Sequence, residues 1–255
     1  MLTRTSRIGA TDGGAVVSWA NAWLLHLASL DEADLAANGT GTGHRISGVP
    51  GESAPVPWSI TWGRLRSAGV DRYCLALPVA GDPLGLRGPA AFNATATATG
   101  VAVIATGDDV CFGLVPGADG GAVLGWQVTA LPVLAPGVGL PQLNEVQGEY
   151  DEVLRDAAAD LVEMDLARAH PAAASAADRC DKMLRAQLLS PALSPRAARL
   201  LVGATRLNTL VSLAMSDDGA AVTAGEAQRR HEVLTRVERV TRRALVAAYS
   251  SVPLP

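Results

Sequence analysis

The chain has 255 residues and a formal net charge of −4, and 49% of its residues are hydrophobic. Its length allows one large domain or two small ones, with enough buried surface to fold without disulfides or metals. The acidic balance argues against a general nucleic-acid binder, because such a protein carries excess positive charge. Three widely spaced cysteines, Cys74, Cys111 and Cys180, match neither a disulfide framework nor a zinc site, so we expect buried thiols.

The uncharged stretch from residue 13 to residue 30 follows two arginines and loosely resembles a signal peptide. Asn21 and His26 interrupt it, and it is too short and too polar to span a membrane. We therefore expect a cytoplasmic protein. The stretch predicts a first helix over residues 15–35, because apolar side chains recur there at spacings of three and four: Val16, Trp19, Trp23, Leu27 and Leu30.

The next segment predicts a loop and a short helix. Residues 38–57 are rich in Gly, Pro, Ser and Thr, which is typical of a loop. Residues 59–68 begin with a serine cap and are followed by a glycine, which favours a helix. A strand is the alternative here, because three large apolar residues alternate with polar ones from residue 58 to residue 62.

Four strands and one further helix are expected between residues 73 and 131. The first strand covers residues 73–79, with Pro78 near its end because proline cannot donate to a sheet ladder. A helix with proline at its first position follows at residues 89–99. The remaining strands are expected at residues 101–105, 110–115 and 123–131. This order predicts a small mixed sheet with helices on at least one face.

Residues 132–141 contain three prolines and two glycines, which is typical of a linker. We expect it to separate a mixed α/β domain at residues 1–131 from a helical domain at residues 142–255. Four helices with short connections predict an antiparallel bundle in the second domain, at residues 142–169, 176–189, 195–215 and 223–249. The predicted fold class is α+β, with an N-terminal helix and a small mixed α/β sheet followed by an all-α four-helix region.

The helix expected at residues 142–169 has an apolar seam and an acidic face. The seam residues expected in the bundle core are Leu143, Val146, Tyr150, Val153, Ala157, Leu161 and Met164. The helix also carries eight acidic residues against two arginines. Acidic residues at spacings of three and four share one face: Glu145, Glu149, Glu152, Asp156, Asp160 and Glu163.

The fourth expected helix has six arginines against three glutamates. We therefore expect the acidic and basic helices to be neighbours, with ion pairs along their rims. Within the fourth helix, Glu238 and Arg242 stand at the i,i+4 spacing of an ion pair, as do two further Glu–Arg pairs. The alternative is an acidic face that is open to solvent and available to a partner.

The loop at residues 81–88 is the strongest candidate for a binding site. It follows an expected strand and precedes an expected helix, where free backbone N–H groups and the helix dipole favour an anion. It lacks the Lys-Ser/Thr of a P-loop and the glycine spacing of a dinucleotide-binding loop. The candidate ligand-binding residues are Gly81, Asp82, Gly85, Arg87, Gly88 and Asn93.

The run LPVAGDPLGLRGPAAFN, from residue 77 to residue 93, resembles uncharacterised conserved proteins of actinobacterial, high-GC type. All but one of the 21 basic residues are arginine, which fits the codon usage of a high-GC bacterial genome. The resemblance implies no activity. It makes the 81–88 loop the first place to look for a site.

No catalytic or metal-binding signature stands out in the sequence. Carboxylate-bridged metal sites in bundles need Glu-x-x-His, and neither His170 nor His231 has an acidic residue three positions earlier. A Gly-x-Ser-x-Gly nucleophile motif is also missing. A histidine-dependent mechanism has four candidates, the other two being His26 and His44. We expect no cofactor and no metal, and the question of enzymatic activity stays open.

Two functions fit these features. The first is a non-catalytic interaction or regulatory protein, whose helices at residues 142–249 bind a protein partner or a second copy. The second is a binding protein or enzyme for a small anionic or phosphorylated compound, which uses the 81–88 loop. Neither involves nucleic acid or a membrane. A loop filled by contacts within the chain favours the first, and a pocket lined by Asp82, Arg87 and Asn93 favours the second.

Overall fold

The computed structural model describes residues 9–39, 43–117, 124–133, 139–163, 189–216 and 224–252, with side chains except at 124, 158–163, 213, 216, 224 and 226. This part of the chain has seven helices and a five-stranded mixed sheet, which confirms the α+β class. In chain order the elements are α1 (Ala10–Leu24), α2 (Leu30–Asn38), β1 (His44–Ser47), α3 (Trp58–Ser67), β2 (Arg72–Ala76), α4 (Ala90–Thr99), β3 (Ala102–Thr106), β4 (Cys111–Pro116), β5 (Leu124–Ala130), α5 (Leu143–Glu163), α7 (Pro195–Ser216) and α8 (Ala224–Ser250).

The five strands form one sheet in the order β1-β5-β4-β3-β2. β1 runs parallel to β5, and the other neighbouring pairs are antiparallel. β3, β4 and β5 form a meander in which Val103 faces Leu114, and Leu114 faces Val128. β2 therefore ends the sheet, and its outer edge is not paired with any strand of the described residues.

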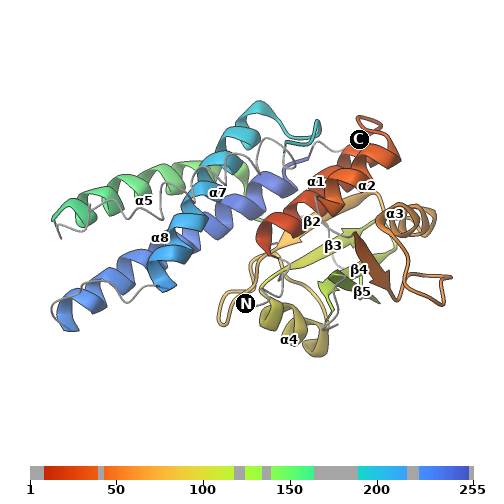
Figure 1. Cartoon of the computed structure of the whole chain (residues 1–255), viewed down its shortest axis with the longest axis horizontal. Coiled ribbons are helices and arrows are strands. Elements are labelled where there is room, and N and C mark those ends of the chain that lie inside the picture. Colours follow the sequence, from red (N-terminus) through yellow and green to blue (C-terminus); the bar gives the residue numbers. More distant parts are fainter. Residues whose placement is uncertain are drawn as a thin grey trace, which may run out of the picture.

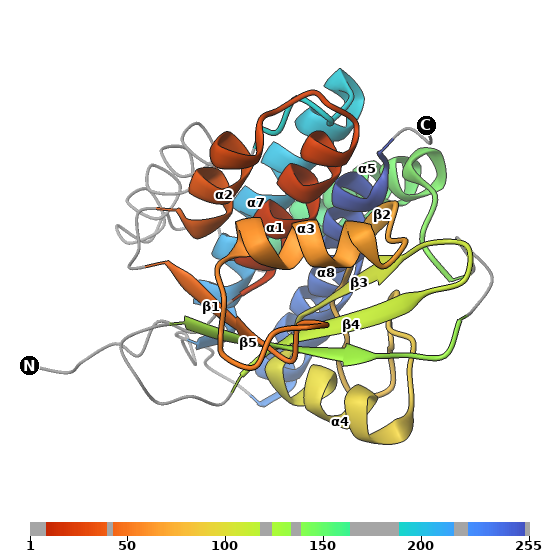
Figure 2. The ribbon, with the colours of Figure 1, turned by 90° about the vertical axis from the view of Figure 1, so that its right-hand side faces the viewer.

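Helices cover both faces of the sheet (Figures 1 and 2), which explains why β2, β3 and β4 are buried on both sides. α1 and α3 lie over the main core, to which the strands contribute Tyr73, Leu75, Val103, Leu114 and Trp126. α4 lies over the opposite face, where Phe92 and Ala96 pack with Ala76, Ile104 and Cys111. The ring of Phe92 occupies the space over Gly113, where any Cβ would overlap it.

The prediction of one helix over residues 15–35 is wrong in its extent, because two helices, α1 and α2, occupy this part of the chain. The chain turns between them, and His26 adopts a left-handed φ of 58° in the turn. Ser29 then begins α2 with a capping box: Glu32 N donates to Ser29 Oγ at 3.2 Å, and Ser29 N donates to Glu32 Oε2 at 2.9 Å. Leu27, which was expected in the apolar stripe, is 53% exposed in the turn.

The loop expected at residues 38–57 is wrong at His44–Ser47, which forms β1. The strand is only four residues long and contains a single aliphatic side chain, so it gives almost no periodic signal. The helix expected at residues 59–68 is confirmed as α3, and its strand alternative is wrong. α4 is also confirmed, with Gly100 in the left-handed conformation after its last residue.

Helices α5 and α7 and the first half of α8 project from the sheet and its covering helices, and we call them the helical arm (Figure 1). α5 and α7 each pack on α8. Near the sheet this packing belongs to the main core, through residues such as Tyr150, Leu201 and Val240. Farther out a separate cluster holds the arm together: Ala157, Val211, Val233 and Val237.

The seam of α5 is confirmed where its side chains are described. Val146, Tyr150 and Ala157 are buried, and Leu143 and Val153 are partly buried. The two remaining seam residues lie beyond the described side chains, and residues 176–188 of the expected second bundle helix lie outside the described residues. The helices expected at residues 195–215 and 223–249 are confirmed as α7 and α8. The division at residues 132–141 stays a prediction, because one core spans both sides of it.

Gly14 in α1 lies against the ring of Tyr249 in α8, and a Cβ at Gly14 would overlap the ring. We expect Gly14→Ala to lower the free energy of unfolding by about 1–3 kcal/mol, because a buried ring must move within a packed core. Urea unfolding measures the change. Gly63→Ala in α3 is the control: its new Cβ meets no atom within 4 Å, and helix propensity should stabilise it by about 0.5–1 kcal/mol. Unchanged stability in Gly14→Ala would contradict the close packing of α1 on α8.

Candidate functional site

Polar side chains from α1 and α8 line the outer edge of β2. Asn21 Nδ2 donates to Tyr73 O at 2.8 Å, and Tyr73 N donates to Asn21 Oδ1 at 2.9 Å. Two residues farther along the strand, Leu75 N donates to Ser250 Oγ at 3.1 Å. Side chains thus satisfy backbone groups that a further strand would otherwise bind.

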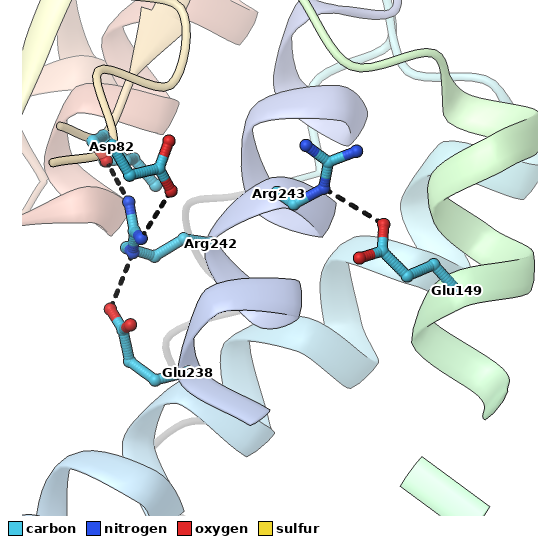
Figure 3. Close-up of polar contacts among 6 residues, drawn as sticks. Asp82, Glu149, Glu238, Arg242 and Arg243 are labelled. Atoms are coloured by element: carbon cyan, nitrogen blue, oxygen red, sulfur yellow. Dashed lines mark hydrogen bonds and ion pairs between the residues drawn. The ribbon is translucent and has the colours of Figure 1, made fainter. Parts of the chain in front are cut away.

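Arg242 of α8 extends this edge into the loop after β2 (Figure 3). Its Nη1 donates to Leu77 O at 2.6 Å, and its Nη2 donates to Asp82 Oδ2 at 2.9 Å. Its Nε lies 2.7 Å from Glu238 Oε1, an ion pair that lacks the alignment of a hydrogen bond. The Arg242 side chain is only 9% exposed, so two carboxylates compensate a guanidinium that is largely removed from water.

The loop at residues 77–88 folds back onto β2. Val79 and Asp82 exchange two backbone hydrogen bonds of 3.0 Å, and Gly81 closes this turn with a φ of 82°. Gly85, with a φ of 80°, approaches β2 so closely that a Cβ would lie 3.1 Å from Leu75 O. A glycine can let a ligand approach the backbone closely, but at Gly85 that space is filled by β2.

The remaining candidate ligand-binding residues have different neighbours. Asn93 Nδ2 donates to Gly88 O at 2.9 Å, which ties the first turn of α4 to the end of the loop. Asp82, in contrast, binds Arg242 across the junction with α8. The structure thus joins Gly88 with Asn93 and Asp82 with α8, and the binding of an anion by these residues stays a prediction.

Arg87 lies near two buried thiols on the face of the sheet that α4 covers. Burial raises the pKa of Cys74 to about 11, although the positive charges of Arg72 and Arg87 oppose the rise. Burial also raises the pKa of Cys111, again against the charge of Arg87. Both thiols are therefore protonated at neutral pH and lack the thiolate that a nucleophile requires. The expectation of buried, unbridged cysteines is confirmed for these two.

The expected contact between the acidic and basic helices exists near the base of the arm. Arg243 Nε donates to Glu149 Oε2 at 3.0 Å, in a pair that is more than one-third exposed (Figure 3). Arg196 of α7 instead donates to neutral side chains of α5, Asn144 at 2.6 Å and Gln147 at 2.5 Å. Among the described residues, three exposed carboxylates of the acidic face of α5 form no ion pair: Glu145, Glu152 and Asp156. The acidic face is thus partly paired and partly open to solvent.

His44, one of the four candidate histidines, lies within an aromatic cluster. Trp58 Nε1 donates to His44 Nδ1 at 2.9 Å, and the rings of Trp62 and Trp126 pack on Trp58. Burial lowers the pKa of His44, although the charges of nearby carboxylates oppose the change. The imidazole is therefore neutral near pH 7, and its Nδ1 serves as an acceptor in the core.

The sequence analysis identified only part of this polar junction. The Glu238–Arg242 pair is confirmed, but the bonds from Arg242 to the loop were missed, as were the roles of Asn21 and Ser250. Asn21 gave a usable signal, because an amide within an apolar helix needs a buried partner. No sequence pattern near either residue predicts the hydrogen bond from Arg242 to Leu77, since the two residues are 165 positions apart.

Two features are absent from the described part of the chain. No group of three or more His, Cys, Asp or Glu side chains within it could hold a metal ion. None of its helices is both long and apolar enough to cross a membrane.

Two family models match the chain. The model of the Rv1486c-like protein N-terminal domain matches residues 14–139, and the model of the C-terminal domain matches residues 144–246. Together they span most of the chain. The family is an uncharacterised mycobacterial one, in agreement with the resemblance noted at residues 77–93. No curated protein and no solved structure matches the chain.

Arg242→Met should lower the free energy of unfolding by about 2 kcal/mol, because it leaves Leu77 O and two carboxylates without their buried cation. This estimate allows for the solvent that reaches Asp82, whose side chain is 35% exposed. Arg243→Met is the matched control from the next position, and its exposed pair should contribute only about 0–1 kcal/mol. Equal losses in the two variants, measured by urea unfolding, would show that the junction with the loop adds no stability.

Stability should fall as the pH drops below about 6.5, the ordinary pKa of histidine. The lowered pKa of His44 means that the unfolded chain binds this proton more readily, so the stabilisation is complete above that pH and declines below it. Thermal melts between pH 7.5 and pH 5 test this expectation. His44→Gln, which retains an acceptor for Trp58, should have a flatter profile than the wild type.

Proposed function

The chain belongs to the Rv1486c-like family, and we propose that it is a non-catalytic interaction protein that binds a protein partner through its helical arm. The observation that carries the proposal is a set of exposed carboxylates on the acidic face of α5 that form no ion pair with any described residue: Glu145, Glu152 and Asp156. Like charges four residues apart, as at Glu152 and Asp156, destabilise a helix by a few tenths of a kcal/mol per pair. A basic partner surface would remove that repulsion.

The shape of the molecule supports the same proposal. The arm extends away from the sheet (Figure 1), and exposed side chains occur along α5 from Glu145 to Asp156. Its inner surface has its own apolar cluster, which allows the outer charged residues to vary in their contacts without loss of the core. A surface of this kind suits the recognition of another protein by charge.

The alternative, an anion-binding protein that uses the 81–88 loop, has less support. Asp82 is bound by Arg242, Asn93 is bound to Gly88, and Gly85 packs on β2. Both cysteines beside Arg87 have raised pKa values, which does not favour nucleophilic chemistry there. These contacts within the chain favour the interaction protein, although Asn93 Oδ1 is buried with no hydrogen-bond partner among the described residues.

The proposal includes a cytoplasmic location, no role for nucleic acid, and a division of the chain near residues 132–141. The boundary between the two family models, after residue 139 and before residue 144, supports that division. A net charge of −4 is consistent with a protein partner and does not suggest a nucleic acid.

A photo-cross-linking amino acid at Arg155, an exposed position on α5, tests the proposal in the native cells. We expect a defined cross-linked species whose partner peptide is identified by mass spectrometry. The same amino acid at Ala94, exposed on α4, should give none. Most of the product should disappear in the triple variant E145Q/E152Q/D156N, because the basic partner then loses its counter-charges.

A matched charge control uses three exposed acidic residues outside the arm, in the variant D71N/D108N/D109N. It changes the net charge by the same amount and should leave the cross-link intact. The absence of a specific product at position 155, or its equal loss in both triple variants, would contradict the use of the arm as a binding surface.

A further inference from the structure

We infer that the chain has a second binding surface, separate from the arm, where the end of α1 meets the last turn of α3. This surface consists of Trp23, His26, Leu27 and Arg66, and we call it the His26 corner. In Figure 1 the arm extends to the left, whereas α3 lies on the right. The His26 corner binds an acidic segment of a protein partner, in which a carboxylate stands beside an apolar side chain.

His26 occupies a position where glycine is the more stable residue. α1 ends in a Schellman motif, because Leu27 N donates to Ala22 O at 2.8 Å and His26 N donates to a carbonyl three residues earlier. The residue at this position is left-handed, here with a φ of 58°, and it is usually glycine because a Cβ strains that conformation. A side chain that is kept despite backbone strain indicates a use for the side chain itself.

The imidazole of His26 lies beside a positioned guanidinium. Arg66 Nη2 is 3.5 Å from His26 Nε2, which is the outer limit of a hydrogen bond. The guanidinium carbon of Arg66 lies 5.0 Å from the centre of the Trp23 ring, in a cation–π contact that holds it in place. When the His26 proton is on Nε2, two N–H donors at this separation can bind the two oxygens of one carboxylate.

The charge of Arg66 is not balanced by an acidic side chain. Two positions earlier on α3, Arg64 pairs with Glu52 at 2.7 Å. Among the described residues no carboxylate forms an ion pair with Arg66, and its two contacts are the aromatic rings of Trp23 and His26. A partner carboxylate would therefore complete a charge-assisted hydrogen bond that the chain itself does not supply.

Leu27 adds apolar surface to the same corner. In a Schellman motif the residue at this position commonly packs on the preceding turn of the helix. Leu27 is instead 53% exposed, directly after His26, and Trp23 is only partly buried. Small ligands are usually held in concave sites, whereas these side chains stand on an exposed turn. A protein segment with an apolar side chain next to its carboxylate is therefore the better match.

NMR titration of the full chain with the dipeptide acetyl-Glu-Leu-amide tests the inference. The indole N–H signal of Trp23 should shift and reach saturation. Acetyl-Gln-Leu-amide has the same shape without the charge, and it should bind about tenfold more weakly or worse. An acetyl-phosphoserine-Leu-amide that binds more tightly than the glutamate peptide would assign the corner to phosphorylated segments and overturn the choice of a carboxylate.

Three variants separate binding from stability. His26→Gly should raise the melting temperature by about 1–3 °C, because glycine adopts the left-handed conformation without strain. The same variant should bind acetyl-Glu-Leu-amide about tenfold more weakly, since one of the two donors is lost. Arg66→Met should weaken binding at least as much. Arg64→Met is the matched control, because it removes another exposed arginine of α3 and should bind as the wild type does.

The inference is overturned if the Trp23 signal does not respond to the glutamate peptide, or if the charged and uncharged peptides bind equally. Unchanged binding in His26→Gly would show that the imidazole takes no part. A lower melting temperature in that variant would show that the imidazole is kept to stabilise the turn, which also overturns it. The cross-link at position 155 should persist in Arg66→Met, so failure of the His26 corner leaves the proposed function of the arm intact.

Discussion

The outer edge of β2 pairs with no described strand, and its backbone groups therefore depend on side chains from distant parts of the chain. A strand at the edge of a sheet leaves backbone N–H and C=O groups that must find partners when they are buried. Here Asn21, Ser250 and Arg242 supply those partners at Tyr73, Leu75 and Leu77, in alternate residues along one side of the strand. α1 and α8 are therefore positioned by hydrogen bonds to the sheet in addition to their apolar packing.

α8 links the two parts of the structure because one continuous helix serves both. Its first half packs in the arm, and its second half lies beside α1 and β2 in the main core. Arg242 stands between these halves and binds the loop after β2 (Figure 3). If a partner bound to the arm displaced α8, the contacts of Arg242 with Leu77 and Asp82 would therefore change as well.

The sequence predicts the elements whose patterns repeat over many residues. α5, α7 and α8 follow from their apolar seams and caps, and β3, β4 and β5 from apolar runs between turns. β1 is not predicted because four residues are too few to show a periodic pattern. The break between α1 and α2 is not predicted because the apolar spacing continues through Leu27 across the turn. The polar contacts of Asn21, Arg242 and Ser250 with β2 and its loop are not predicted, for a different reason. The partners are up to 175 residues apart, and only the fold brings them together.

The distance along the chain between β2 and Ser250 also has a consequence during synthesis. Leu75 is made 175 residues before the hydroxyl that it binds, which corresponds to roughly 10–35 s at typical translation rates. Of the three described side chains that bind this edge, only Asn21 precedes β2 in the chain. An open edge strand can pair with the same segment of a neighbouring nascent chain on one polysome. Pro78, which cannot donate to such a ladder, limits the length of that exposed edge.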